Sequence, residues 1–220
     1  VRCSKGMHRE RPSAANLSGR TWKTSRQQNS SHEGGSSAMR KDSIDILGED
    51  HRQVSFTRRV LELLSFDRRK IFGQPVPDGD GCGRQFVNGK YAELVARNRQ
   101  KRSFAMRTLV VSIDADNQSI QQRKRELDEQ LKAANMDIRE SAEPVVVWVP
   151  KRNIETWLLH LTGKEVDESQ NYKQQVREGK ILKAASERFV DELRVWRKTP
   201  AVVSSLPSLI DAYSELERIL

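Results

Sequence analysis

Three acidic residues follow predicted strands, and their type and spacing suit the binding of a divalent cation. Glu49 comes directly after the segment 43–47 and Gly48, and Asp114 and Asp116 follow the apolar segment 108–113. In extended backbone, side chains two residues apart point the same way, so the two aspartates can face one ion. Clustered carboxylates repel one another unless a cation neutralises them, and Mg²⁺ prefers oxygen ligands of this kind. The pattern therefore predicts a Mg²⁺ site, with Mn²⁺ as a substitute.

The same acids also have an ordinary structural explanation. An acidic residue after a strand often caps the next helix, and Asp50 or Asn117 could take that role here. A single acid in this position is more typical of a cap than of a metal ligand. The metal interpretation depends on the combination of Asp-x-Asp after a strongly apolar strand with a glutamate after another strand.

Four predicted strands alternate with predicted helices over residues 41–163. The strands are expected at 43–47, 70–72, 108–113 and 145–149. Strands separated by helices are typical of βαβ units, which form a mainly parallel sheet covered on both faces. Right-handed crossovers place the carboxyl ends of the strands on one edge, where open α/β sheets form their sites. The predicted fold is an α/β domain with a mainly parallel, four-stranded Rossmann-like sheet flanked by helices.

Helix starts and buried faces are predicted from capping residues and from apolar residues three or four apart. Asn88 is expected to cap the helix after the second strand. Ser119 and Gln122 are expected to form a capping box for the helix after the third strand. That helix is expected to bury its apolar stripe of Ile120, Leu127, Leu131 and Ala134. Residues 164–220 are expected to form a C-terminal helical extension packed on the α/β domain.

The amino-acid composition limits the classes of protein to which this chain can belong. The 220 residues are 36% hydrophobic and 31% charged, and no segment has the roughly 20 apolar residues of a membrane span, so a soluble protein without membrane contacts is predicted. Two cysteines and no apolar leader favour a reducing compartment, with the cytoplasm as the expected location. Residues 1–40 hold eight Lys/Arg and two acids. They are expected to be a disordered basic extension, or an upstream segment before a natural start at Met39.

Basic side chains that could contact a nucleic-acid backbone occur in three places. Arg97 and Lys101 belong to a cluster near the end of the second predicted helix, and residues 123–125 form another cluster. Lys164 and Lys173 follow the helix after the fourth strand. A phosphate track needs such groups, but each is also typical of a solvated helix face.

The order of these motifs resembles the TOPRIM domain. A strand ending in Gly48-Glu49 and a later apolar strand ending in Asp114-Ala115-Asp116 are similar to its two acidic motifs. Residues 153–158, Asn-Ile-Glu-Thr-Trp-Leu, are similar to an Ile-Glu-x-Trp-Leu signature of small stand-alone members related to the overcoming-lysogenization-defect nucleases. The likeness covers residues 43–162 and reaches weakly into the C-terminal helices. The Gly/Pro-rich segment 75–83 departs from it, and no topoisomerase tyrosine domain or primase zinc module is visible.

The resemblance implies Mg²⁺-dependent hydrolysis of phosphodiester bonds in DNA or RNA, in phage defence or DNA repair. Asp114 and Asp116 would hold the metal, and Glu49 would be a ligand or the general acid/base. Glu155 would be a further catalytic carboxylate, although an acid in the first turn also favours a helix by itself. An ATPase or another defence or repair protein is the partner that the resemblance suggests.

Two other functions are compatible with the sequence. Residues 41–220 carry 31 basic and 28 acidic residues, and this near-neutral charge suits a non-catalytic TOPRIM-like module that binds or regulates within a defence or repair complex. A receiver-like phosphotransfer domain would use Lys151 after the fourth strand, but its acids would follow a different order.

Overall fold

The computed structural model describes residues 43–74, 83–101, 107–176, 180–203 and 206–220. The basic extension expected at residues 1–40 lies outside these ranges, as do residues 75–82 of the Gly/Pro-rich segment. None of the helices within these ranges combines the length and the apolar character that a membrane crossing requires.

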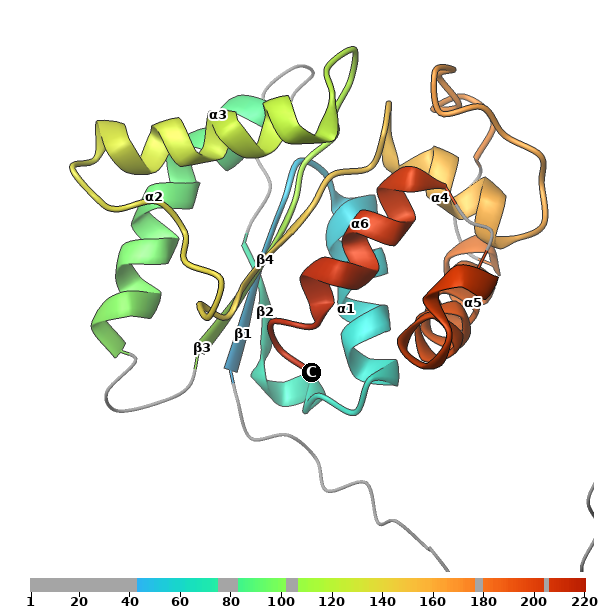
Figure 1. The fold of residues 1–220 in the computed structure, drawn as a ribbon, viewed down its shortest axis with the longest axis horizontal. Coiled ribbons are helices and arrows are strands. Elements are labelled where there is room, and N and C mark those ends of the chain that lie inside the picture. The colour runs from blue at the N-terminus through green and yellow to red at the C-terminus, as the bar shows by residue number, and fades with distance from the viewer. Residues whose placement is uncertain (1–42, 75–82, 102–106, 177–179, 204–205) are drawn as a thin grey trace, which may run out of the picture. The chain divides into compact units, whose positions relative to one another are not determined.

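A sheet of four parallel strands lies at the centre of the domain (Figure 1). The strands are β1 (Ser43–Gly48), β2 (Ile71–Gly73), β3 (Arg107–Ser112) and β4 (Val145–Trp148), in the order β2-β1-β3-β4. The predicted α/β fold with a four-stranded parallel sheet is therefore confirmed. The chain moves outward from β1 to β2 on one side and from β3 to β4 on the other. The winding reverses between β1 and β3, and open α/β sheets bind ligands at such a switch point.

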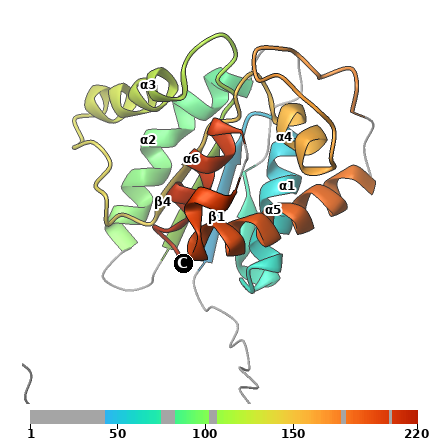
Figure 2. The same cartoon turned by 45° about the vertical axis from the view of Figure 1, so that its right-hand side comes forward.

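Six helices cover the two faces of the sheet. They are α1 (His51–Leu63), α2 (Gly83–Lys101), α3 (Ile120–Ala133), α4 (Ile154–Leu161), α5 (Lys180–Lys198) and α6 (Pro207–Leu216). Helices α2 and α3 lie on one face, whereas α1, α4, α5 and α6 lie on the other (Figures 1 and 2). The C-terminal helices thus share a hydrophobic core with the sheet.

Successive strand residues point into two different cores, as expected for a sheet covered on both faces. In β3, Val110 packs with the core of α1 and the C-terminal helices, and Leu109 and Val111 pack against α2 and α3. The first core contains tilted and edge-to-face aromatic pairs, such as Phe56 and Phe189 with ring centroids 5.6 Å apart. Such pairs stabilise a core beyond the area that they bury.

Two of the expectations for the helices are wrong. Helix α2 begins at Gly83, so Asn88 lies inside the helix, and its buried side-chain Oδ1 has no hydrogen-bond partner among the described residues. The capping box of Ser119 and Gln122 at α3 is confirmed, but Ala134 is exposed at the end of that helix. Its buried stripe includes Arg123, which is four residues before Leu127 and is fully buried.

The open edge of β4 is covered by side chains of an ion-pair cluster. Glu215 of α6 accepts a hydrogen bond from the backbone N–H of Val147 (3.1 Å), and Arg139 donates to the carbonyl of Val145 (2.7 Å). Edge strands with unpaired backbone groups can pair with other chains. The cluster therefore completes the sheet at β4.

Candidate functional site

Glu49 and Asp114 meet at the switch point of the sheet. Gly48 of β1 is paired with Ser112 of β3, so the two strands end level with each other. The side chain of Glu49 then reaches across, and its Oε1 accepts a hydrogen bond from the backbone N–H of Asp114 (3.2 Å). The two acids that the sequence placed after separate strands are therefore neighbours.

Gln53 of α1 links these two acids. Its Nε2 donates to Asp114 Oδ1 (2.7 Å), and its Oε1 accepts from the backbone N–H of Glu49 (2.8 Å). Asp50 caps α1 by accepting from the backbone N–H of Gln53 (2.7 Å), which confirms one of its expected roles. Because Gln53 is fully buried, it holds the Asp114 carboxylate in a fixed position relative to the backbone of Glu49.

The turn after β3 is fixed by the buried Arg123. Its guanidinium donates to the carbonyls of Asp114 (2.9 Å) and Ala115 (3.3 Å), and it approaches Asp116 Oδ2 at 3.4 Å. Asp116 has a left-handed backbone with φ of 51° and forms an isolated antiparallel bridge with Arg152. A non-glycine residue in this conformation is uncommon. The Asp116 side chain is about half exposed, at 48%, so it faces the solvent beside Glu49 and Asp114.

Burial and nearby negative charge raise the pKa of both carboxyl groups. Burial, followed by repulsion from Asp116, raises the pKa of Glu49 from 4.5 to about 7, although Arg123 opposes the shift. Burial, followed by repulsion from Glu49, raises the pKa of Asp114 well above its usual range, and Lys173 opposes this shift. Paired carboxyl groups in a cleft with raised pKa values are typical of functional sites, because a bound cation or a proton relieves them.

Gly83, the first residue of α2, lies directly against Glu49. A Cβ atom at Gly83 would meet the backbone oxygen of Glu49 at 2.5 Å and the Cβ of Glu49 at 2.9 Å. A side chain at this position would therefore displace Glu49, so the glycine permits the start of α2 to close one side of the site.

Of the other residues predicted for the site, Glu155 and Lys173 lie near Glu49 and Asp114, which we call the acidic pair. Glu155 is buried in the first turn of α4 and forms an ion pair with Arg52, while its buried Oε2 accepts no hydrogen bond from the part of the chain that the structure describes. The Nζ of Lys173 is 3.9 Å from Asp114 Oδ2. Both side chains also influence the pKa of Asp114, which Glu155 raises and Lys173 lowers.

Within the described residues, no contact joins Arg97 or Lys164 to Glu49 or Asp114. Arg97 forms an ion pair with Asp45 of β1 (3.1 Å). Lys164 is exposed after α4, and the side chain of Lys101 lies outside the described residues. Their expected contacts with nucleic acid stay predictions.

A pocket of about 390 Å³ adjoins the acidic pair. Its walls include the cations Arg84, Arg123, Arg152 and Lys173 together with Asp116. Arg123 is already bonded to the turn after β3, and the other cations can provide charge-assisted donors for an anionic group such as a phosphate. The arrangement can therefore bind an anion next to the carboxylates.

Sequence reasoning did not assign Gln53, Arg84 or Arg152 to the site, and it placed Arg123 in a surface cluster. A signal existed for two of them. Gln53 lies on the apolar stripe of α1, seven residues before Val60, and Arg123 lies on the stripe of α3. A polar residue at a buried helix position must have a specific partner. Arg84 and Arg152 carry no such signal, because they are brought to the pocket by tertiary packing.

The donor set suits Mg²⁺ in part. No group of three or more His, Cys, Asp or Glu side chains among the described residues is arranged to hold a metal ion. Mg²⁺ usually takes only one or two carboxylates and keeps several waters. Glu49 and Asp114 supply two such groups, and because burial raises the pKa of both, a bound cation would favour their ionised forms. The three-carboxylate site with Asp116 stays a prediction.

Comparison with known protein families, curated proteins and solved structures found no match for this chain.

The stability of the metal-free protein is expected to fall as the pH rises from about 4.5 to 7. Glu49 holds its proton more tightly in the folded protein, with a pKa of about 7, than in the unfolded chain at 4.5. The folded state is therefore favoured at low pH, and at most about 3 kcal/mol of this preference is lost across the interval. The check is the difference in unfolding free energy between wild type and Glu49→Gln at each pH.

The matched control is Glu129→Gln on the exposed side of α3. Glu129 is 63% exposed, so its substitution is expected to leave the slope of stability against pH unchanged. Equal slopes for wild type and Glu49→Gln would contradict the assignment of this pH dependence to Glu49.

Addition of Mg²⁺ is expected to raise the unfolding temperature more at pH 7.5 than at pH 5, because metal ligands must be deprotonated.

Proposed function

We propose that this protein is a Mg²⁺-dependent nuclease of the TOPRIM type, which hydrolyses phosphodiester bonds of DNA or RNA. The observation that carries the proposal is that Glu49 and Asp114 meet at the carboxyl edge of the sheet, at its switch point, beside a pocket lined by four cationic side chains. Glu49 and Asp114, which are distant in sequence, thus lie together beside cationic side chains that can bind a phosphate. The order of motifs that resembles TOPRIM adds to this support.

Each side chain has a role in the proposal. Asp114 and Glu49 would hold Mg²⁺, with Asp116 at the solvent side. Mg²⁺ at this position would supply charge for the phosphate and lower the pKa of a water molecule. In the alternative in which Glu49 does not bind the metal directly, its pKa of about 7 in the metal-free protein would suit a general acid or base, which must exchange a proton near neutral pH.

The cationic residues would bind the substrate. Arg84 and Arg152 can donate hydrogen bonds to phosphate oxygens from the wall of the pocket. Lys173, 52% exposed and 3.9 Å from Asp114, can neutralise charge that develops on the phosphate. Glu155, which is held by Arg52, would be a further carboxylate for the reaction.

A second candidate is a non-catalytic module that binds nucleic acid or a protein of a defence or repair complex. The specific observation in its favour is that cations of the chain itself already accompany the acids. Lys173 lies near Asp114, and Arg123 approaches Asp116 at 3.4 Å. These contacts reduce the need for a metal ion.

The test is cleavage of end-labelled single-stranded DNA, double-stranded DNA and RNA by the purified chain. Cleavage of at least one substrate with Mg²⁺ or Mn²⁺, and none with EDTA, is expected. Binding of nucleic acid without cleavage under every metal condition would favour the second candidate. If the chain neither binds nor cleaves any of these substrates, the nuclease proposal and the nucleic-acid-binding form of the second candidate are contradicted.

A further inference from the structure

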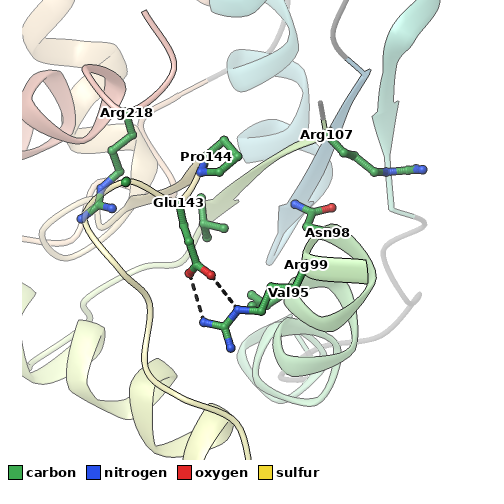
Figure 3. Close-up of a pocket in the computed structure, with 9 residues that line it drawn as sticks. Val95, Asn98, Arg99, Arg107, Glu143, Pro144 and Arg218 are labelled. Carbon is green, nitrogen blue, oxygen red and sulfur yellow. Dashed lines mark hydrogen bonds and ion pairs between the residues drawn. The ribbon is translucent and has the colours of Figure 1, made fainter. Parts of the chain in front are cut away.

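A second pocket lies at the opposite edge of the sheet from the acidic pair. It has a volume of about 300 Å³ and lies between α2, the starts of β3 and β4, and the residue Arg218 after α6 (Figure 3). Arg107 and Val145, the first residues of β3 and β4, form part of its wall. The pocket is therefore at the amino edge of the sheet and separate from the proposed metal site.

Asn98 of α2 presents an unpaired amide to this pocket. The residue is only 6% exposed, and neither its Nδ2 nor its Oδ1 makes a hydrogen bond within the part of the chain that the structure describes. Figure 3 shows its side chain rising from α2 between Arg107 and Glu143. A buried amide without partners is costly, and native proteins rarely contain one without a reason. Here the reason would be a ligand with an adjacent donor and acceptor.

The walls of the pocket also favour a negative ligand. Three arginines line it, and Glu143, its one acidic lining residue in the described chain, already bonds to Arg99 through both oxygens (2.6 and 3.0 Å). Behind the wall, Asp45 is shared by Arg107 and Arg97. Guanidinium groups therefore outnumber carboxylates around the pocket, which attracts an anion.

Arg218 and several apolar side chains also line the pocket. The guanidinium of Arg218 donates to two backbone carbonyls, at 2.7 and 2.9 Å, and its Nε lies 3.3 Å from the Glu215 carboxylate. Because Lys124 and Arg139 share that carboxylate, part of the charge of Arg218 is available to a ligand. Val95, Pro144 and Val145 supply apolar surface. Small-molecule sites combine such a surface with a few polar groups, and about 300 Å³ is at the small end of their range.

We propose that this pocket binds a purine mononucleotide, with the edge of the base on Asn98 and the phosphate toward the arginines. An asparagine amide can pair with adenine through two hydrogen bonds, donating to N7 and accepting from the exocyclic amine. The base would pack on the apolar wall. This inference does not depend on the nuclease proposal, because the two pockets lie at opposite edges of the sheet.

The test is calorimetric titration of the full chain with AMP, and with adenosine and inorganic phosphate as its two halves. AMP is expected to bind at least about tenfold more tightly than either half. Asn98→Leu is expected to weaken AMP binding about tenfold or more, because two hydrogen bonds are lost. Without ligand, the same variant is expected to unfold at the wild-type temperature or above it, since the amide makes no hydrogen bond to the residues that the structure describes.

Two further variants separate this site from alternatives. Asn98→Asp keeps the shape but adds a negative charge, and it is expected to weaken AMP binding at least as much as Asn98→Leu. Asn117→Ala, beside the acidic pair, is the matched control and is expected to leave AMP affinity unchanged. No AMP binding, equal binding by wild type and both Asn98 variants, or loss in Asn117→Ala alone would overturn the proposal.

Discussion

Cleavage by the Asp114→Asn variant is expected to be at least about 100-fold slower than cleavage by the wild-type protein in Mg²⁺, a loss of roughly 3 kcal/mol in transition-state stabilisation. Asp114 is fully buried and supplies the negative charge that would hold the metal. Asparagine has the same size and keeps an oxygen that can accept from Gln53, as Asp114 Oδ1 does now at 2.7 Å. The substitution therefore removes charge while it preserves the hydrogen-bond network.

The measurement separates a loss of activity from a loss of fold. Burial raises the pKa of Asp114 well above its usual range, so the neutral variant is expected to unfold, without Mg²⁺, at the wild-type temperature or above it. Added Mg²⁺ is expected to stabilise the wild type more than the variant. The readouts are the cleavage rate under saturating Mg²⁺ and the unfolding temperature with and without the metal.

Asp50→Asn is the matched control. Asp50 lies next to Glu49 in sequence, but it caps α1 by accepting from the backbone N–H of Gln53. Asparagine and aspartate cap helices about equally well, so cleavage near the wild-type rate is expected. Wild-type activity in Asp114→Asn, or equal losses in the two variants, would show that charge at Asp114 has no special role.

The fold could be predicted from the sequence because its signals are local. The strand predicted at 108–113 corresponds to β3 at Arg107–Ser112, and the one at 145–149 corresponds to β4 at Val145–Trp148. Short apolar runs separated by amphipathic helices leave few arrangements other than a covered parallel sheet. The same topology places the residues after β1 and β3 together, which is why the proximity of Glu49 and Asp114 could be anticipated.

The rest of the site depends on packing that no local pattern specifies. Helix α2 begins at Gly83, where the chain packs against Glu49, rather than at the polar Asn88 that resembles a cap. Arg123 belongs to a run of three basic residues in sequence, yet it is buried under the turn of Asp114 and Asp116. A capping or charge pattern describes one helix alone, whereas these positions are decided by contacts between elements.

The partners in long-range ion pairs also could not be predicted from the sequence. The sequence places Lys124 in the same basic run, but the structure joins it to Asp211 and Glu215 of α6, both at 2.8 Å. Pairs separated by about 90 positions cannot be recognised from spacing along one helix. They determine which residues are free to bind a ligand, and so the sequence could not delimit a nucleic-acid surface.

Replacement of Glu215 by alanine is expected to lower the free energy of unfolding by about 3 to 5 kcal/mol, because it removes one partner of a buried ion cluster. The Glu215 carboxylate accepts from Lys124 (2.8 Å), from Arg139 (3.0 Å) and from the backbone N–H of Val147 (3.1 Å). Alanine would leave these donors without their acceptor and would expose the edge of β4. Denaturant unfolding at pH 7 measures the change.

Glu217→Ala is the matched control in the turn that follows α6. Glu217 pairs with Arg197 at 2.9 Å, but both side chains are more than 40% exposed, and exposed pairs contribute about 1 kcal/mol or less. Glu215→Gln is expected to be intermediate, because it keeps an acceptor for Val147 but not the charge. Equal, small losses in Glu215→Ala and Glu217→Ala would exclude a structural role for the cluster.

The pH dependence of this effect distinguishes the charge of Glu215 from its packing. Burial alone would raise the pKa of Glu215, but the hydrogen bonds and charge of Arg139, and then those of Lys124, lower it from 4.5 to about 2. The stabilisation is therefore present above pH 4.5 and is lost as the pH falls toward 2. The difference between wild type and Glu215→Gln should shrink over this interval, opposite in direction to the loss expected for Glu49 as the pH rises. A difference that stays constant with pH would mean that packing and the bond to Val147, rather than charge, account for the contribution of Glu215.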